Sequence, residues 1–504
     1  MNILGRKVNG ASFFKGDLAI WMMMLILCLI SVLVIYSSTA SMAYSVRDGN
    51  TSYFLTRHIM VVLVSIGAAM VVQFINFRFY YRFAKYFFIL SIFLLMMTFF
   101  NGATYNDESR WISLFGLTFQ PSDFVKITLV MLLAKELSKR QRIMKNLRII
   151  PPFWRIDAKK NKKKNLEVLQ KITLPILVPI VISVVLIMIS NLSTALIIAF
   201  TAFVMLIIGR VAIKELFRLV LLAICLFVLA VGIIALTGKG RVDTWVSRIE
   251  SFVSGTDVKD VNINDMDEQT FQKYQAKIAV ASGGLIGVGP GNSTQRSSLP
   301  HSYSDYVYAF IVEEYGLIGA TIVLLLYFSI FYRSMMMLKN CKTAFPALLI
   351  VGLSFTITAQ AMLHMMVSAN VGPVTGQTLP LISWGGSSLL TTCIALGMIQ
   401  GVVRRVKEIQ KMDELDNKRH LMLEEWEQVE LVEKDLGEDS VVIIEEEAEE
   451  EEIVIRSSEE IDILLQKDRL TKALESEKYQ PVIMWEEKKD SDNSVNKDDY
   501  EDNI

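Results

Sequence analysis

The sequence predicts an all-α, polytopic membrane protein with about ten transmembrane helices, a large extracytoplasmic loop between helices seven and eight, and a disordered acidic cytoplasmic tail. Three observations support this prediction. The 504 residues are 52% hydrophobic, with a mean hydropathy of +0.40. Apolar runs of about twenty residues, long enough to cross the hydrocarbon layer, recur as far as Val403. After Arg404 the chain becomes densely charged, so the net charge of −1 only averages a basic part and an acidic part.

The apolar runs place the expected helices in order. The first run follows a basic start and precedes small residues, as in a signal peptide, but it is longer than a typical signal core. More runs follow it, so we expect an uncleaved first span. The fourth run is short and contains Asp123 and Lys126. The expected spans are residues 18–38, 55–75, 83–100, 122–137, 172–190, 193–209, 216–237, 306–332, 344–367 and 382–403.

Lys and Arg occur in every second joint between these spans. Because both residues concentrate on the cytoplasmic side of a membrane, we expect both termini in the cytoplasm. Residues 1–17 are then a cytoplasmic N-terminus and residues 18–405 the membrane domain. The basic joints follow spans two, four, six, eight and ten, at Arg78, Arg82 and Lys85; Lys139 to Lys171; Arg210 and Lys214; Arg333, Lys339 and Lys342; and Arg404, Arg405 and Lys407.

Two long polar segments remain. The outward loop of residues 238–304 contains an amphipathic stretch from Gln269 to Ala281, which we expect to fold back onto the membrane surface. The tail of residues 406–504 begins with a charged helical pattern and reaches Glu445 to Glu452, where seven of eight residues are Glu. Such a block repels itself and stays solvated, so we expect a mostly disordered tail or a partner-binding helix.

Several functional classes find no support in the sequence. The four cysteines show neither a disulfide framework nor metal-ligand spacing. No Walker motif, zinc motif or serine triad pattern is present. Membrane topology and contact with anionic lipid explain the positive charge of the joint after span four, so we expect no nucleic-acid partner. The glycine-rich stretch of residues 282–292 follows no strand, so it is no dinucleotide fingerprint. It is a flexible turn or an anion nest of backbone N–H groups.

Ionisable residues within or beside spans are the first candidates for a site, because their burial is costly. We expect Asp305 at the outer membrane interface. Partial exclusion of water there can raise the pKa of a carboxyl group and let it serve as a general base. The alternative is an ordinary acid at a helix start. Glu313 follows about 12 Å further along the helix, and for Glu313 and Glu314 the alternative is interhelical pairing.

Two further stretches lie at the starts of spans. Lys126 lies three residues after Asp123, so the two form an ion pair, or Lys126 faces a cavity and meets an anionic ligand. At the start of the tenth span, small residues around Gly385 favour close helix packing.

Together these stretches closely resemble the FtsW/RodA/SpoVE family of bacterial cell-wall glycosyltransferases, over about Leu18 to Arg405. The long tail and the Gly-Asn-Ser stretch are more similar to the septal branch, FtsW, than to RodA. The matching residues, in family order, are Arg110-Trp111; Gln120-Pro121-Ser122-Asp123 with Lys126; Tyr274-Gln275; Gly283-Gly284; Gly291-Asn292-Ser293 with Gln295; Leu299-Pro300 with Asp305, Glu313, Glu314 and Gly316; and Leu379-Pro380 with Ser383-Trp384-Gly385-Gly386-Ser387-Ser388.

The chain departs from the family at two notable places. Between spans five and six the family usually has an acid in a Gln-Pro-Asp-type motif, whereas this chain has Asn191 within the stretch Ser190 to Thr194. No role of that acid carries over. His301 stands where the family often has Glu, four residues from Asp305, so we expect the pH response of the site to differ.

The resemblance implies a peptidoglycan glycosyltransferase in the cytoplasmic membrane, at the division septum, which polymerises lipid II into β-1,4 glycan strands on the outer face. It implies Asp305 as the catalytic base of an inverting displacement of undecaprenyl pyrophosphate. A class B penicillin-binding protein and other divisome proteins are the implied partners. The metal is unknown, and the one cofactor considered is a divalent cation, Mg or Mn. The implied substrate-binding residues are Arg110, Lys126, Gln275, Arg296, Glu313, Glu314 and Ser387, of which Arg110, Lys126 and Arg296 are candidates to hold the pyrophosphate.

Two alternatives stay open. A lipid II flippase also needs charged residues in helices, but a carrier needs them at the membrane midplane, whereas these are expected at the outer rim. A divisome scaffold would use the acidic tail to recruit partners.

Overall fold

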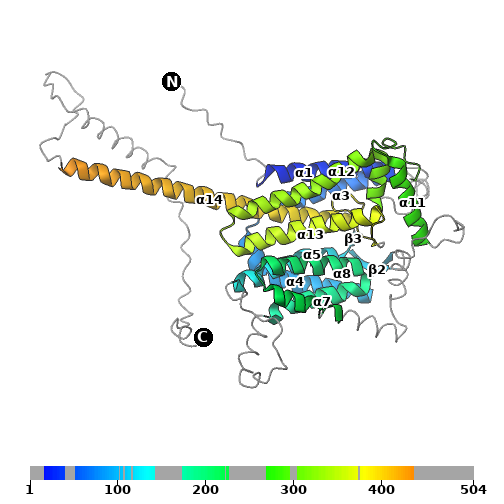
Figure 1. Cartoon of the computed structure of the whole chain (residues 1–504), viewed down its shortest axis with the longest axis horizontal. Coiled ribbons are helices and arrows are strands. Elements are labelled where there is room, and N and C mark those ends of the chain that lie inside the picture. Colours follow the sequence, from blue (N-terminus) through cyan, green and yellow to red (C-terminus); the bar gives the residue numbers. More distant parts are fainter. Residues whose placement is uncertain are drawn as a thin grey trace, which may run out of the picture. The chain divides into compact units, whose positions relative to one another are not determined.

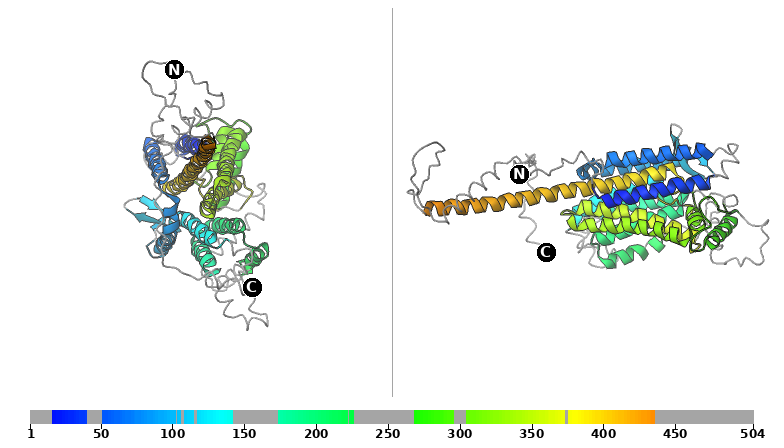
Figure 2. Two further views of the ribbon diagram at one scale, coloured as in Figure 1. Left: turned by 90° about the vertical axis from the view of Figure 1, so that its left-hand side faces the viewer. Right: turned by 90° about the horizontal axis from the view of Figure 1, so that it is seen from above.

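The structure is a computed structural model of the chain (Figure 1), and it describes residues 16–39, 51–101, 103–105, 108–114, 117–141, 173–221, 223–225, 268–295, 304–372 and 375–435. The chain divides into two units, Met1–Lys407 and Glu408–Ile504. The described part of the first unit is mostly helical, and its helices run side by side (Figure 2).

The chain is a polytopic helical membrane protein. Among the described helices, six are long and apolar enough to cross a membrane, and two more are apolar but shorter. Large apolar side chains such as Leu29, Ile89 and Val181 are exposed on them, as expected where lipid surrounds the helices. The six are α1 (Leu18–Ser38), α3 (Thr51–Val72), α4 (Phe77–Asn101), α12 (Val307–Met337), α13 (Ala344–Ser368) and α14 (Gly386–Asp435), and the shorter two are α7 (Leu174–Ser190) and α8 (Leu192–Ile208).

Local sequence sets the start of several helices. Asp17 caps α1, because its Oδ1 accepts from the backbone N–H groups of residues 19 and 20 at 2.9 and 3.3 Å. Pro121 lies in the first turn of α5 (Pro121–Arg140), where its missing N–H costs nothing. Asn191, the residue that departs from the family motif, caps α8 by accepting from Thr194 N at 3.2 Å.

Helix α5 is the most charged of the expected spans, and the structure shows why it tolerates the charge. Fifteen of its twenty residues are buried, and it contacts α4, α7, α8 and α13. Its charges form ion pairs, Asp123 with Lys126 near its start and Glu136 with Arg140 near its end. Because protein rather than lipid surrounds this helix, paired charges replace the apolar surface that a lipid-facing span needs.

The prediction of an all-α fold is wrong for the joint between α4 and α5. This joint forms a three-stranded antiparallel sheet in the order β1-β2-β3. Ile112 pairs with Phe119, and both are residue types that favour strands. A search for long apolar runs does not detect strands this short. They are β1 (Ala103–Tyr105), β2 (Glu108–Leu114) and β3 (Leu117–Phe119).

The described helices overlap nine of the expected spans, and most ends are shifted by a few residues. The exception is α14, which continues to Asp435, so the first part of the expected disordered tail is helical, as its charged helical pattern indicated. For the seventh span, residues 213–221 and 223–225 are helical, and the remainder lies outside the described residues. The tenth helix starts at Gly386 rather than at residue 382, because a turn with a φ of 67° at Leu381 precedes it. Within the expected outward loop, the amphipathic stretch forms α11 (Glu268–Gly283). Residues 436–504 of the expected tail lie outside the described residues.

Candidate functional site

A glycine-rich loop of residues 283–295 is inserted into a break in α12. The backbone at Gly316 has φ 68° and ψ −173°, so the helix is interrupted there. In an unbroken helix, the N–H groups of residues 317 and 318 would donate to the carbonyls of residues 313 and 314. Four bonds between the loop and the helix replace those two. They are Val288 N to Glu313 O (2.9 Å), Gly289 N to Glu314 O (3.0 Å), Leu317 N to Gly284 O (3.0 Å) and Ile318 N to Leu285 O (3.2 Å).

Glycine is required where the loop and the helix meet. A Cβ atom at Gly316 would lie 2.3 Å from the carbonyl oxygen of Leu285. A Cβ at Gly287 would lie 2.2 Å from the carbonyl oxygen of Glu314. Both contacts are to backbone atoms, which cannot rotate away, so a side chain at either position would separate the loop from α12.

The same loop surrounds the carboxylates of Glu313 and Glu314, which are 0% and 1% exposed. Its donors to Glu313 come from three consecutive residues. The bonds to Glu313 are from Thr294 N (2.8 Å), Thr294 Oγ1 (3.0 Å) and Gln295 N (3.2 Å) to Oε1, and from Ser293 Oγ (2.5 Å) to Oε2. The bonds to Glu314 Oε1 are from Gly291 N (2.9 Å) and, at the end of α1, from Ser37 Oγ (2.5 Å).

These contacts decide between the two interpretations of the glycine-rich stretch. The loop is held to α12 at many points, so it is no free turn. Its N–H groups do bind anions, and those anions are the chain's own Glu313 and Glu314 carboxylates. The expected interhelical pairing of the two glutamates is replaced by contacts with this loop, apart from the bond from Ser37 on α1.

Asp305 lies two residues before α12, whose N-cap is Tyr306, and it is half-buried. The preceding carbonyl, Ser304 O, accepts from Ser383 Oγ at 2.8 Å. Ser383 Oγ in turn accepts from Leu379 N at 2.7 Å. The first turn of α12 is also covered by α11, so the backbone that carries Asp305 is anchored on two sides. The contact with α11 is made by Ala276, Ala279, Tyr306 and Ala309.

Helix α11 also positions Gln275, which is half-buried and lies one turn before Ala279 on the same helical face. Lys273 and Lys277 add positive charge to this helix. Burial and, second, the neighbouring Lys277 lower the pKa of Lys273.

The segment of residues 375–385, between α13 and α14, is held by buried polar side chains. Their donors bind its backbone carbonyls, which keeps the segment rigid without secondary structure. The ring of Trp384 stacks on His58 with centroids 5.4 Å apart. The bonds to the carbonyls are Ser31 Oγ to Ile382 O (2.7 Å), the Tyr327 hydroxyl to Pro380 O, and His364 Nδ1 with Gln377 O (2.6 Å). This segment therefore links the hydrogen bond from Ser383 to Ser304 O, next to Asp305, with a second polar region.

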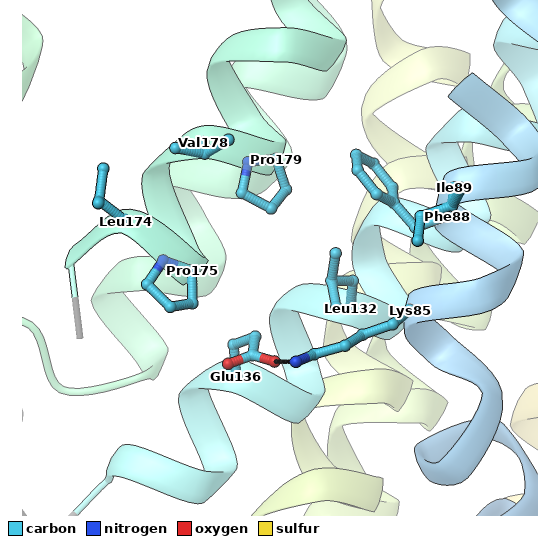
Figure 3. Close-up of a pocket in the computed structure, with 9 residues that line it drawn as sticks. All are labelled: Lys85, Phe88, Ile89, Leu132, Glu136, Leu174, Pro175, Val178 and Pro179. Atoms are coloured by element: carbon cyan, nitrogen blue, oxygen red, sulfur yellow. Dashed lines mark ion pairs between the residues drawn. The ribbon is translucent and has the colours of Figure 1, made fainter. Parts of the chain in front are cut away.

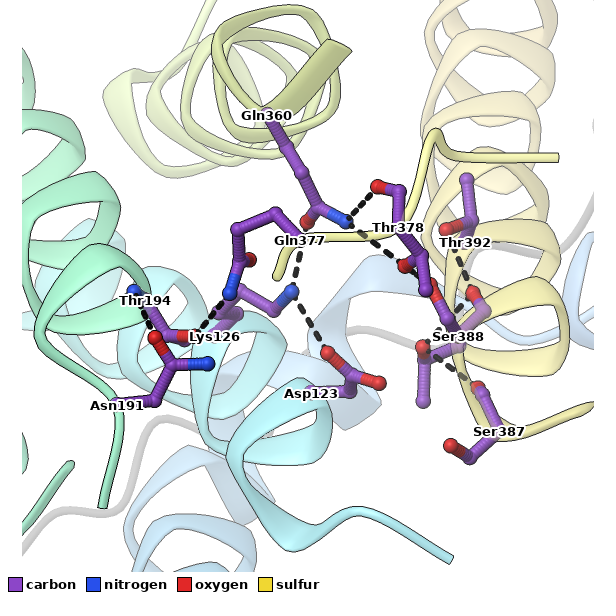
Figure 4. Close-up of polar contacts among 11 residues, drawn as sticks. Asp123, Lys126, Asn191, Thr194, Gln360, Gln377, Thr378, Ser387, Ser388 and Thr392 are labelled. Atoms are coloured by element: carbon purple, nitrogen blue, oxygen red, sulfur yellow. Dashed lines mark hydrogen bonds and ion pairs between the residues drawn. The ribbon is translucent and has the colours of Figure 1, made fainter. Parts of the chain in front are cut away.

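That second region is a hydrogen-bonded network inside the helical unit (Figure 4), which we call the buried polar network. Lys126 Nζ lies 2.7 Å from Asp123 Oδ1 and donates to Gln360 Oε1 at 2.7 Å. Gln360 Nε2 donates to Thr378 O at 2.9 Å, and Thr378 Oγ1 lies 2.8 Å from Ser388 Oγ. The expected ion pair of Asp123 and Lys126 is confirmed, and an added anion at Lys126 would compete with Asp123.

Lys126 is expected either to pair with Asp123 or to face a cavity, and it does both. The ion pair lines a cavity of about 30 Å³ together with Gln360, Thr391 and Thr392. A cavity of this size admits water. Asp123 Oδ2 has no hydrogen-bond partner among the described residues, and a water molecule is the usual partner of such an oxygen.

A branch of the buried polar network reaches α8. Gln377 Nε2 donates to Thr194 Oγ1 at 2.7 Å, and Thr194 N donates to the capping Asn191 (Figure 4). Asn191 Nδ2 and His364 Nε2 are buried and have no hydrogen-bond partner among the described residues. Asn191, which stands in the turn where the resemblance implies an acid, is therefore a neutral helix cap.

The structure brings some of the expected site residues together and leaves others undescribed. Ser387 lies in the first turn of α14 next to Ser388, and its buried Oγ has no hydrogen-bond partner among the described residues. Arg110 lies in β2, but its side chain is outside the described part, as are Arg296 and His301 entirely. Within the described residues, no group of three or more His, Cys, Asp or Glu side chains is arranged to hold a metal ion.

Sequence reasoning missed Gln360 and His364. The two lie one turn apart on α13, where each contacts the segment of residues 375–385. The signal was present, because both are polar residues inside an apolar span. The prediction took its candidates from ionisable residues at the ends of spans, so it did not include these two residues.

Comparison with known proteins places these features in a family context. The FtsW/RodA/SpoVE family, described as cell cycle proteins, matches residues 17–408. The probable peptidoglycan glycosyltransferase FtsW of Bacillus subtilis (strain 168) is 26% identical over 397 residues, which cover 78% of this chain and 91% of that protein. Its namesake in Pseudomonas fluorescens (strain SBW25) is 28% identical over 415 residues, covering 81% and 89%. A solved peptidoglycan synthase complex that coordinates polymerization and crosslinking contains a chain of similar fold, with a TM-score of 0.56 at 21% identity, covering 78% of this chain and 98% of that one.

Proposed function

Because the chain belongs to the FtsW/RodA/SpoVE family of cell cycle proteins, we propose that it is a peptidoglycan glycosyltransferase, which polymerises lipid II into β-1,4 glycan strands during cell division. Its curated relatives carry that enzymatic name. Reaction takes place at the outer face of the cytoplasmic membrane, at the septum. The chain crosses the membrane ten times with both termini in the cytoplasm, so Asp305, α11 and the glycine-rich loop lie outside.

The anchoring of Asp305 is the observation that carries this proposal. A half-buried carboxylate precedes α12. The carbonyl of the residue before it, Ser304, accepts from Ser383, and the first turn of α12 that follows it is covered by α11. A general base has to be held within hydrogen-bond reach of the proton it takes. This arrangement supplies a rigid base at the end of a helix rather than on a free loop.

In the proposed reaction Asp305 takes the proton from the 4-hydroxyl of the acceptor's N-acetylglucosamine. The oxygen attacks C1 of the donor's N-acetylmuramic acid, the bond from C1 to the pyrophosphate oxygen breaks, and undecaprenyl pyrophosphate leaves. One direct displacement at an α-linked donor inverts the centre and yields the β-1,4 bond. Both substrates are membrane-anchored, so holding them in one orientation supplies part of the acceleration.

Negative charge builds on the leaving pyrophosphate, so fixed cations stabilise the transition state. Arg110 and Arg296 provide these cations. Lys126 is already bound to Asp123 and Gln360, and its role is to keep the buried polar network in place. A divalent cation would supply further Lewis-acid stabilisation of the pyrophosphate when bound, but no step here is routed through it.

The other expected substrate contacts divide into two groups. Glu313 and Glu314 are surrounded by loop donors, so they position the loop that leads to Arg296 instead of touching a sugar. Gln275 and Ser387 are the candidates for direct hydrogen bonds with the substrate. We assign to this enzyme a class B penicillin-binding protein as partner, which crosslinks the strands, together with other divisome proteins.

Replacement of the proposed base tests the function. Asp305→Asn keeps the size of the side chain but removes its basicity, so purified protein should lose polymerisation of lipid II, while Asp305→Glu should retain a part. Retained polymerisation by Asp305→Asn at normal protein level would eliminate the assignment of the base. Measurement of lipid II translocation in vesicles distinguishes a glycosyltransferase from a flippase, because a flippase with Asp305→Asn would still translocate lipid II. Deletion after about Lys411 separates a scaffold, because catalysis should survive that truncation.

A further inference from the structure

A groove opens between α4, α5 and α7 (Figure 3), and its lining residues include neither Asp305 nor any member of the buried polar network. It has a volume of about 360 Å³ and is open to the surface. Phe88, Leu174, Val178 and Pro179 form apolar walls, and Lys85 and Glu136 lie together at one end. We call this the α4–α7 groove. None of its residues takes part in the proposed glycosyl transfer.

The shape of the groove follows from the prolines of α7. Pro175 lies in the first turn and Pro179 inside the helix. Proline inside a helix removes one backbone hydrogen bond and disturbs the preceding turn, and both prolines line the groove. Val178 stays 41% exposed on the wall. An apolar slot lined this way accepts a hydrocarbon chain.

The charged end of the groove holds a surplus cation. Glu136 is nearly buried, with a side chain 3% exposed, and Arg140 donates to both its carboxylate and its carbonyl. Lys85 Nζ lies 3.9 Å from Glu136, beyond hydrogen-bond distance, and its side chain is 61% exposed. Lys85 (Figure 3) and Arg140 therefore share one carboxylate as ion-pair partners, which leaves one positive charge in excess, and the Lys85 side chain stays largely exposed.

More positive charge gathers at the same end. Lys135 and Lys139 follow on the last turns of α5. The joint between α5 and α7, residues 142–172, lies outside the described residues, and its sequence contains ten Lys or Arg residues against two acids. On the topology proposed above, this end faces the cytoplasm, and the apolar walls begin about one helical turn deeper, since Phe88 follows Lys85 by three residues.

We propose that the α4–α7 groove binds an anionic phospholipid of the cytoplasmic leaflet. Its phosphate contacts Lys85 and the neighbouring cations, and one acyl chain runs between Phe88 and Val178. The order of groups matches such a lipid along its length, with cations at interface depth and an apolar slot below them. A zwitterionic lipid fits the slot equally well but gains less from the cations.

Photocrosslinking of the full chain tests this proposal. The protein is reconstituted in phosphatidylcholine vesicles that contain a trace of phosphatidylglycerol with a diazirine in one acyl chain, or the matching phosphatidylcholine probe. Crosslinked peptides from α4 and α7 should be several-fold more abundant with the phosphatidylglycerol probe. Lys85→Gln should lower that yield about fivefold, the effect expected for loss of one interfacial cation. Lys339→Gln, at another basic joint, should leave the yield unchanged.

A second pair of variants tests the slot itself. Val178→Trp fills the groove and should abolish crosslinking there, whereas Val181→Trp places the same ring on the lipid-facing surface of α7 outside the groove and should not. Equal yields with both probes, or an unchanged yield in Lys85→Gln, would overturn the proposal. Lipid II polymerisation by each variant checks that the chain is folded, and it is independent of the crosslinking result.

Discussion

Substitution of Gly316 by Ala should release the glycine-rich loop from α12. The backbone at Gly316 has φ 68° and ψ −173°, a region that is essentially restricted to glycine. An added Cβ would meet Leu285 O at 2.3 Å and Gly287 N at 2.5 Å. Alanine is also the best helix former, so the substitution favours closing the helix and expelling the loop.

The magnitude follows from the bonds involved. Closing the helix exchanges four bonds between loop and helix for two helical bonds, a net loss of about 2 kcal/mol at about 1 kcal/mol each. The Glu313 carboxylate, which is 0% exposed, then loses its loop donors. An uncompensated buried charge costs about 3–5 kcal/mol. We therefore expect destabilisation of about 5–7 kcal/mol.

Thermal unfolding of the purified protein in detergent, together with limited proteolysis of the loop, measures this effect. Gly316→Ala should lower Tm by roughly 5–10 °C and expose the loop to protease well below Tm. The matched control is Gly67→Ala. Its Cβ meets nothing within 4 Å in α3, so Tm should stay or rise slightly. A Gly316→Ala protein with a Tm within a degree of the unaltered chain, and with an intact loop, would refute the proposed role of the break.

Two further predictions concern the buried polar network and the anchor of the base. Lys126→Met should destabilise the protein by about 3–5 kcal/mol, because Asp123 stays buried without its partner. The double variant Lys126→Met with Asp123→Asn should recover most of the loss in Tm. Losses in Tm that simply add in the double variant would contradict the pairing. Ser383→Ala should lower kcat for lipid II polymerisation about fivefold with little change in KM, because one hydrogen bond of about 1 kcal/mol to Ser304 O, next to the proposed base, is lost. Ser383→Thr should restore part of the rate, and a change in KM alone would point to substrate binding instead.

Much of the candidate site could be predicted because its residues stand at span ends. Asp305, Lys126 and Ser387 all lie within the first turns of helices or directly before them. The ion pair of Asp123 and Lys126 depends only on local spacing along α5, so the sequence predicts it correctly.

The partners of Glu313 and Glu314 could not be predicted in the same way. Their place in an apolar span shows that the two carboxylates lie within a membrane helix, but it does not say what surrounds them. The glycine-rich stretch, in turn, shows a supply of N–H groups but no anion. Neither the glutamates nor the glycine-rich stretch predicts the other as its partner. The break at Gly316, which brings them together, depends on the close approach of the loop backbone to the α12 backbone.

The sequence by itself determined the class of the protein, the positions of most spans and the family to which the chain belongs. It could do so because a bilayer imposes length and apolarity on each helix regardless of its neighbours. The tertiary structure decided which polar groups meet. It joined Gln360 to Lys126 across 234 residues and Ser383 to Ser304 across 79, because buried hydrogen bonds depend on where packed helices place their side chains, and that placement is a property of the whole bundle.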